Sequence, residues 1–325
     1  MQLIEPKVEL IKEHNPLKKI EIAGRTCYKS EANITDESAN KFFRTLAKNS
    51  HMAMLEHATF VFETTREDIY LCCSRNKYFN CTETKFINAD IRDKDSKIEN
   101  SRYIISANLR AIIESGNMYL ICPLYRHNPS VVFLNENTSE ILEEYLSRIK
   151  EDDIKVIDIN DIEFIHSEEV KKHMYTTMRF TCDRGVSHEI VRHRLFSFAQ
   201  ESTRYVNYNK EQNGLGDIKF ITPADYDSWD ENTKCDFKNA LEYSERYYNK
   251  LIESGRVAQE ARAVLPNAVK TEIVITGNHE EWLHFFNLRS FGTTGKPHPD
   301  MKKVADLALK IYPIKIEIQT NEFKS

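Results

Sequence analysis

Glycine and long apolar runs are scarce in this chain, and each scarcity excludes a class of protein. Only nine glycines occur among 325 residues, and Gly214 and Gly216 stand in a polar stretch without the remaining spacing of a dinucleotide-binding loop. No run approaches the roughly 18 apolar residues that a membrane helix needs. The N-terminus is charged and lacks the apolar stretch of a signal peptide. We therefore expect no Rossmann motif, no membrane association and a cytoplasmic location.

The chain also lacks an excess of positive charge and any C-x-x-C pair. A net charge of −5 does not favour nucleic-acid binding over the whole surface, so an anion site must be local. Seven cysteines are an odd number, which is typical of reduced thiols in a cytoplasmic enzyme. A hydrophobic content of 41% in 325 residues is enough for the core of one large domain or of two domains.

Apolar periodicity predicts an α+β fold, with a mixed or antiparallel sheet core packed against helices. Alternating residues predict strands at 58–64 and 174–182. Helical spacing and capping residues predict six helices. The first covers 35–48 with Thr35 as its cap, and the second begins after the cap Asp183 and carries HEIVRHR. The others are expected at 231–254, after Gly255 as far as Leu265, from Asn278 to Arg289, and from Pro299 to the residue before Pro313. Residues 66–173 differ in character, with long polar and acidic stretches, and we interpret them as a large insertion of about 100 residues whose role is unknown.

One stretch carries unusual chemistry, RHRLFSFAQESTRY at residues 192–205. Its arginines stand among apolar and hydroxyl side chains, which indicates a locally buried anion because an unpaired buried guanidinium is costly. His188 and His193 resemble a zinc-binding pair with one residue too many, since i and i+5 lie about 140° apart on a helix. We therefore expect no metal site and consider that His193 could simply be a packed core histidine.

Arg192-His193-Arg194, seven further residues and Ser202 resemble the signature of flavin-dependent thymidylate synthases. Arg204-Tyr205 continues the family's S-x-R-Y pattern. Four other segments resemble the family in order along the chain: GRTCY at 24–28, HMAMLEHATFVF at 51–62, ARAVLP at 261–266 and TGNHEEWLHFFNLR at 276–289. The resemblance covers about residues 20–65 and 174–312, and it implies a catalytic domain at 1–65 and 174–325 that is interrupted by the insertion at 66–173.

The resemblance implies a role for each matched residue. The implied catalytic residue is Arg289, which in the family favours ionisation of the uracil ring. The residues implied to bind FAD are His51, Ala53, Glu56, Arg192, His193, Arg194, Gln200, Asn278, Glu280 and His284. The residues implied to bind dUMP are Glu189, Arg192, Gln200, Glu201, Ser202, Thr203, Arg204, Arg262 and Arg289. No residue is implied to bind a metal.

The resemblance further implies reductive methylation of dUMP to dTMP. NADPH would reduce FAD, methylenetetrahydrofolate would donate the carbon, and the reduced flavin would supply the hydride. Relatives are homotetramers with active sites shared between subunits, so we expect the same assembly here. Two alternatives remain: a non-catalytic nucleotide-binding relative, and an RNA- or DNA-binding module, which the acidic net charge disfavours.

Glu189 stands where relatives usually have a glutamine that touches the pyrimidine. An ionised glutamate only accepts hydrogen bonds, so it could accept from the uracil N3–H. It could equally form an ion pair with Arg192, three residues further along the expected helix. Both hypotheses predict that glutamine can replace this residue better than alanine can.

Overall fold

The computed structural model describes residues 1–89, 97–132, 136–158, 168–208, 217–314 and 316. The chain forms two compact units, the first made of Met1–Ile11, Thr176–Phe196 and Gln200–Ser325 and the second of Lys12–Tyr175 and Ser197–Ala199. Within the described ranges, no helix is long and apolar enough to cross a membrane. Gly214 and Gly216, where the sequence predicts no Rossmann loop, lie outside the described residues.

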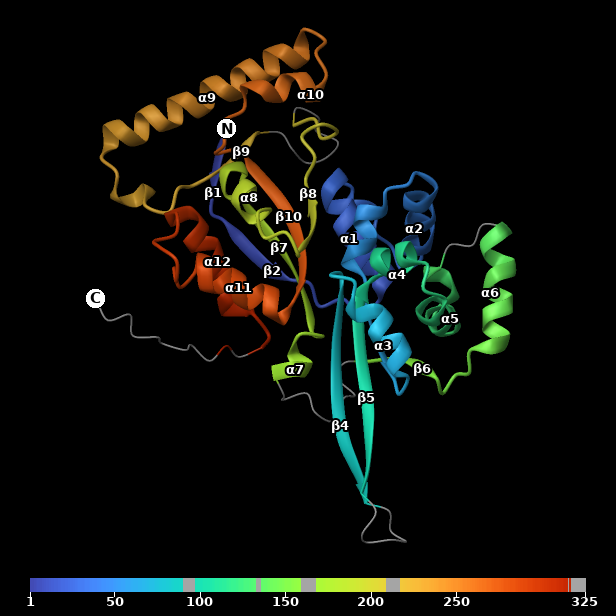
Figure 1. Cartoon of the computed structure of the whole chain (residues 1–325). Coiled ribbons are helices and arrows are strands. Elements are labelled where there is room, and N and C mark those ends of the chain that lie inside the picture. Colours follow the sequence, from blue (N-terminus) through green and yellow to red (C-terminus); the bar gives the residue numbers. More distant parts are fainter. Residues whose placement is uncertain (90–96, 133–135, 159–167, 209–216, 315, 317–325) are drawn as a thin grey trace, which may run out of the picture. The chain divides into compact units, whose positions relative to one another are not determined.

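The first unit contains a sheet whose central strand was predicted from alternation. Val8 of one strand lies opposite Phe180 of the next in an antiparallel register, and a third strand follows them in the sheet. A separate parallel pair joins Leu3 to Phe220. The strands are β1 (Gln2–Ile4), β2 (Lys7–Leu10), β7 (Tyr175–Asp183), β9 (Lys219–Ile221) and β10 (Lys270–Asn278), and β8 (Ser197–Gln200) contributes only Gln200 to this unit (Figure 1).

The helices of the first unit are α8 (Arg184–Ile190), η6 (Tyr226–Ser228), α9 (Glu231–Glu253), α10 (Ala258–Ala261), η7 (Arg262–Val264), α11 (His279–Arg289) and α12 (Pro299–Ile311). The predicted caps are confirmed for two of them. Asp183 accepts from the Val186 N–H at the start of α8. Asn278 and Glu281 form a reciprocal capping box at the start of α11. This box fixes the beginning of the helix that carries Arg289.

Aromatic packing holds α11 against the sheet of the first unit. Trp282 is fully buried, stacks on Phe180 of β7 and donates its indole N–H to the Thr176 carbonyl. Phe285 meets Phe180 edge to face. Burying these rings removes a large apolar surface from water and places the end of α11 firmly in the unit.

The second unit is built on an antiparallel sheet in the order β4-β5-β3-β6. Phe62 of β3 lies opposite Ile105 of β5, and both side chains are fully buried in the core of the unit. Figure 1 shows β4 and β5 as a long hairpin. The strands are β3 (Thr59–Thr64), β4 (Phe79–Ala89), β5 (Lys97–Asn108) and β6 (Ile154–Ile157).

The second unit also contains α-helices and short 3-10 helices. They are α1 (Pro16–Tyr28), η1 (Glu31–Asn33), α2 (Ser38–Lys48), η2 (Met52–His57), α3 (Glu67–Ser74), α4 (Leu109–Ser115), α5 (Met118–His127), η3 (Pro129–Val131), α6 (Glu136–Arg148) and α7 (Glu168–Lys171). Both units thus combine helices with antiparallel strands, which confirms the predicted α+β class.

Two predicted helices differ from the structure. The helix expected at 35–48 begins at Ser38, because the Ser38 hydroxyl accepts the Thr35 N–H and donates to its carbonyl, which closes a turn ahead of α2. The helix expected to carry HEIVRHR ends at Ile190, and residues 191–196 form turns instead. The domain boundaries expected at 65 and 173 stay a prediction, and residues on both sides of position 65 belong to the second compact unit.

Candidate active site

Arg289, at the last position of α11, is held by two side chains of the first unit. Its Nε donates to the His193 Nε2 over 3.2 Å, and its terminal nitrogen donates to a Glu189 carboxylate oxygen over 2.9 Å. The two contacts use different edges of the planar guanidinium, so they fix its orientation. Glu189 therefore pairs with Arg289 and not with Arg192, which corrects the ion-pair hypothesis drawn from a continuous helix.

His193 is neutral in this arrangement. Burial, with the neighbouring charge of Arg289 and with His284, lowers the pKa of His193 to about 4. Its ring packs edge to face on Phe285, 5.1 Å between centroids. Because a guanidinium only donates, Nε2 must carry the lone pair and the ring proton resides on Nδ1. His193 is thus a half-buried acceptor that positions Arg289, and more than the simple core residue considered from the sequence.

A close packing contact explains why the chain leaves the helix after Ile190. Phe196 inserts beside Gly277 of β10, where an added Cβ would lie 2.1 Å from the phenyl ring. Phe196 also packs against Trp282 with ring centroids 4.7 Å apart. Tight turns from His193 to Phe196 deliver the ring to this place. The turn consequently exposes Arg192 and Arg194 on the surface.

A second group of polar residues forms around the S-x-R-Y segment. Arg262 donates to the Thr203 hydroxyl over 3.1 Å, and Arg204 donates to the Gln259 side-chain oxygen over 3.2 Å. The Ser202 hydroxyl accepts the Arg204 backbone N–H. Both guanidinium groups have neutral partners here, so their positive charges are uncompensated by these contacts. Such a group can bind a phosphate through charge-assisted hydrogen bonds.

Glu201 is buried in the first unit and has several internal partners, and its role in nucleotide binding stays a prediction. One carboxylate oxygen accepts from the Lys270 ammonium over 2.9 Å and from the Glu272 backbone N–H over 3.2 Å. The other accepts from the Tyr208 hydroxyl over 3.3 Å. Although burial alone would lower the pKa of Lys270, Glu201 and Glu272 raise it above its ordinary value. Glu201 thereby anchors the segment that carries Ser202, Thr203 and Arg204.

Gln200 is held in a similar way. Its side-chain amide donates to the Ser187 hydroxyl over 2.8 Å and to the Thr271 hydroxyl over 3.2 Å. Ser187 lies on α8 and Thr271 on β10, so Gln200 joins these two elements. The amide oxygen makes no hydrogen bond within the described part of the chain and can accept from a ligand.

The three predicted flavin residues on or before α11 have different environments. The Asn278 side-chain oxygen is used by the capping box, and the residue is buried. Glu280 and His284 are exposed, and the His284 ring meets His193 with centroids 5.7 Å apart. His284 is therefore close to the Arg289 group, while Asn278 acts first as a helix cap.

The predicted flavin residues His51, Ala53 and Glu56 belong to the second unit. His51 and Ala53 are exposed at the start of η2, and the His51 Nδ1 lies 3.2 Å from the Tyr28 hydroxyl. Glu56 forms an ion pair with Arg110 over 2.8 Å. The remaining predicted site residues lie in the first unit.

The expectation that the chain has no metal site stays a prediction. Among the described residues, no three His, Cys, Asp or Glu side chains are grouped so that they could hold a metal ion. His188 and His193 are separated by the end of α8, because the helix stops at Ile190.

Sequence reasoning missed the side chains that support this site. Lys270 and Thr271 of β10, Ser187 of α8 and Gln259 of α10 carry no motif of their own. The one available signal was the spacing of Lys270 and Glu272, since residues two apart on a strand point to the same face. The spacing of this pair indicates an ion pair on one face of the strand, but it does not predict that Glu201 is the third residue of the network.

The family model for "Thymidylate synthase complementing protein" matches residues 9–76 and 136–313. The chain belongs to this family. The match includes every predicted site residue and leaves out residues 77–135, which contain β4, β5, α4, α5 and η3.

Curated members of the family cover parts of the chain. The flavin-dependent thymidylate synthase of Geobacter sulfurreducens is 37% identical over 106 residues, which are 33% of this chain and 43% of the relative. That of Pyrococcus abyssi is 31% identical over 146 residues, 45% of this chain and 58% of the relative. The chain thus spans about half the length of the curated relatives that it matches.

Among solved structures, the UMP/dUMP methylase PolB from Streptomyces cacaoi bound with 5-Br dUMP covers 71% of this chain and 88% of its own, with 17% identity and a TM-score of 0.37. A TM-score this low does not establish a shared fold.

Proposed function

We propose that this chain is a flavin-dependent thymidylate synthase. It converts dUMP to dTMP, with methylenetetrahydrofolate as the carbon donor and NADPH-reduced FAD as the source of hydride. Family membership supports the reaction class, and the curated relatives carry this name. The observation that carries the proposal is Arg289, a guanidinium oriented by neutral His193 and by Glu189 in the first unit.

Arg289 suits the activation of a uracil ring. Ionisation at N3 spreads negative charge over the flanking carbonyl oxygens, and a fixed guanidinium stabilises that charge without reorganising. His193 accepts from one edge of Arg289 and leaves the side chain only one orientation. Glu189 neutralises Arg289 in the free enzyme, so the substrate carbonyls compete with this carboxylate for the same donors.

The arginines of the R-H-R motif fit the phosphate groups of FAD. Arg192 and Arg194 are exposed, and their guanidinium groups form no hydrogen bond or ion pair with any residue that the structure describes. Guanidinium donors without internal partners are suited to a diphosphate. When bound, the flavin supplies hydride. The protein's own residues bind and orient the ligands, and His284 lies beside His193 with ring centroids 5.7 Å apart.

The nucleotide phosphate has a matching group in the S-x-R-Y segment. Within the described part of the chain, Arg262 and Arg204 contact neutral groups, which are the Thr203 hydroxyl, the Gln259 side chain and the Tyr205 ring, and their charges can pair with a phosphate dianion. The buried ion pair of Glu201 and Lys270 fixes the start of the S-x-R-Y segment, so the hydroxyl and backbone amide groups of this segment are preorganised.

Assembly and location are further parts of the proposal. The resemblance implies a homotetramer with shared active sites and a cytoplasmic enzyme. Light scattering of the active protein tests the first point, because a monomer with full activity would contradict it.

The decisive experiment combines spectroscopy and product analysis. The purified protein is mixed with FAD, and the flavin absorbance bands that remain after gel filtration are recorded. Thymidylate formation is then measured with dUMP, methylenetetrahydrofolate and NADPH, omitting each in turn. We expect bound flavin, and product only in the complete mixture. Protein that binds dUMP but forms no thymidylate would be a non-catalytic relative, and protein that binds neither FAD nor dUMP would refute the proposal.

A further inference from the structure

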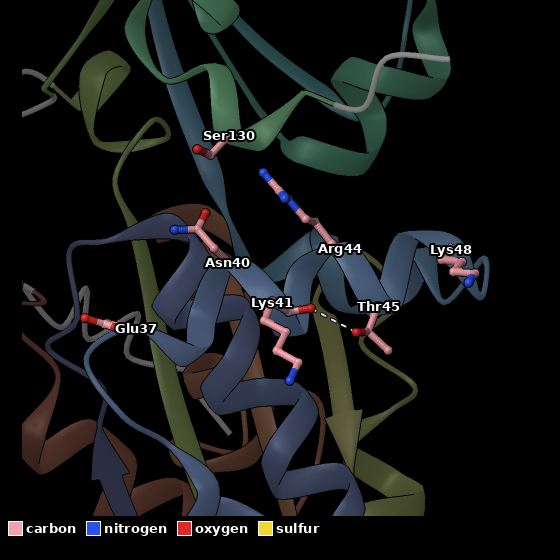
Figure 2. A pocket seen from close by; sticks show the side chains of 7 residues that line it. All are labelled: Glu37, Asn40, Lys41, Arg44, Thr45, Lys48 and Ser130. Atoms are coloured by element: carbon pink, nitrogen blue, oxygen red, sulfur yellow. Dashed lines mark hydrogen bonds between the residues drawn. The ribbon is translucent and has the colours of Figure 1, made fainter. Parts of the chain in front are cut away.

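The second unit contains an open cavity of about 510 Å³ that none of the proposed catalytic residues lines. One wall is the outer face of α2, with Lys41, Arg44 and Lys48, and the opposite wall carries Ser130 of η3 (Figure 2). Asn40 also lines the cavity, and its side chain lies below Ser130 in the same view. Two segments far apart in the sequence thus line one open polar cavity.

Helix α2 has two faces of opposite chemistry. Ala39, Phe43 and Leu46 are buried in the core of the second unit. The exposed face presents Lys41, Arg44 and Lys48, whose spacing of three and four residues aligns them along the helix. An amphipathic helix often carries charge on its solvent face, so charge alone would not indicate a site.

The absence of acidic partners distinguishes these cations. Lys41, Arg44 and Lys48 form no hydrogen bond through their charged groups and no ion pair with any described residue. Glu37 lines the same cavity one helical turn before Lys41, yet the two side chains do not pair. Other cations of the second unit do pair with acids, as in Lys18 with Asp36, Lys29 with Glu31, Arg66 with Asp68, Arg110 with Glu56 and Arg148 with Glu144.

The neutral groups of the cavity complete a set of donors. The Ser130 hydroxyl has no partner among the residues that the structure describes, and Arg44 points toward it (Figure 2). The Thr45 hydroxyl is different, because it already donates to the Lys41 carbonyl within the helix. A serine hydroxyl and an asparagine amide beside a guanidinium are typical of phosphate and carboxylate sites.

We propose that this cavity binds a small oligoanion, a chain of phosphate or carboxylate groups. Lys41 and Lys48 are separated by about 10 Å along the helix axis, which one phosphate cannot span. Lys41 extends away from Ser130 while Arg44 extends toward it, so the charges are spread along the helix (Figure 2). An extended ligand with several charges matches this arrangement better than a single ion.

The cavity combines a part of the chain that the family model matches, residues 9–76 with α2, and a part that it does not match. Ser130 lies in the segment 77–135, which the family model does not match. The proposal also stands independently of the thymidylate synthase activity, because it concerns binding by residues outside the proposed catalytic set.

Calorimetric titration of the full chain tests the proposal with two probes, tripolyphosphate and an oligo-γ-glutamate. A triple variant, Lys41→Gln, Arg44→Gln and Lys48→Gln, removes the cations of α2. We expect the unchanged protein to bind at least one probe, and the variant to lose at least about tenfold in affinity. Binding should weaken as salt is raised, since the charges are exposed. The tighter probe identifies the source of the anion as a phosphate chain or a polycarboxylate.

The matched control is Lys238→Gln, Arg246→Gln and Lys250→Gln, which removes the same residue types from the exposed face of α9. It should bind the probe as the unchanged protein does. A single Arg44→Gln variant repeats the test if the triple variant folds poorly, and it should weaken binding several-fold. The proposal is overturned if the unchanged protein binds neither probe, or if the α2 and α9 variants weaken binding equally.

Discussion

Replacing Glu189 tests how Arg289 is held. The pair is partly exposed, with side-chain accessibilities of 22% for Arg289 and 38% for Glu189. An exposed ion pair contributes about 0–1 kcal/mol, and a hydrogen bond to a charged group about 1.5–3 kcal/mol. Glu189→Gln keeps an acceptor oxygen at nearly the same place and loses the charge. We expect it to raise the barrier by about 1 kcal/mol, so that thymidylate formation stays within roughly tenfold of the original rate.

Glu189→Ala removes the acceptor as well. The Arg289 terminal nitrogen then lacks its 2.9 Å partner, and the side chain retains only the contact with His193. Leaving a partly buried donor without a partner costs about 1–3 kcal/mol. Together with the greater freedom of the guanidinium, we expect a loss of about 2–3 kcal/mol, which is roughly 30- to 150-fold in kcat/KM.

Steady-state kinetics with dUMP as the varied substrate separates the two variants. Glu242→Gln serves as the control, because Glu242 is an exposed glutamate on α9 without a partner among the described residues. It should leave both kcat and KM unchanged. If Glu189→Gln is as inactive as Glu189→Ala, the negative charge itself is required, and our reasoning that Glu189 acts as a replaceable acceptor is wrong.

Three further predictions follow from the contacts of the site. Arg204→Ala and Arg262→Ala should each weaken nucleotide binding by about 2–5 kcal/mol if the phosphate pair is desolvated, while FAD remains bound, and unchanged affinity in a titration would rule out the phosphate assignment. Lys270→Met should destabilise the fold by about 3–5 kcal/mol, because it leaves the buried Glu201 carboxylate without its cation, and denaturant unfolding at an unaltered midpoint would contradict this. Burial raises the pKa of Glu281 from 4.5 to about 7, so its contribution to stability is present below pH 4.5 and is lost as the pH rises through 7, an effect of at most about 3 kcal/mol. Glu281→Gln should flatten this part of the pH profile of unfolding, and an equally steep profile would count against the shift.

Local signals in the sequence were sufficient for several elements of the fold. The capping box of Asn278 and Glu281 depends on residues three apart, and the structure confirms it. The strand expected at 174–182 and the helix expected at 231–254 follow from periodicity within each segment, and both agree with the structure to within a residue. These features are set by neighbours along the chain, which a single sequence displays directly.

The end of α8 depends on a contact that the sequence does not display. Residues 184–194 have helical spacing, but Phe196 packs beside Gly277, far along the chain. The backbone must turn before Phe196 to bring its ring there. Tertiary packing therefore overrides the local preference, and the geometry inferred for Glu189 and Arg192 from a continuous helix was wrong.

The charged residues show why the site could be predicted only in part. Motif position predicted that Arg289 and Glu201 would both contact nucleotide, yet their internal partners differ. Arg289 finds its carboxylate, Glu189, 100 residues away in the sequence, and Glu201 finds its ammonium, Lys270, 69 residues away. A buried charge must be neutralised or hydrogen-bonded, and only the folded chain shows which charges are.

Basic residues with an internal acidic partner and basic residues without one have different roles in this acidic protein. Lys270 is neutralised by acids within the fold, so its charge is used to position the segment that precedes Arg204. Arg192 and Arg194 have no such partner in the described part of the chain, so their charges remain available to anionic ligands. Arg289 lies between these cases, because its partner Glu189 is a partly exposed carboxylate, with which we propose that the substrate competes. In a chain of net charge −5, we propose that the cationic groups without internal acidic partners are the ones that bind phosphate.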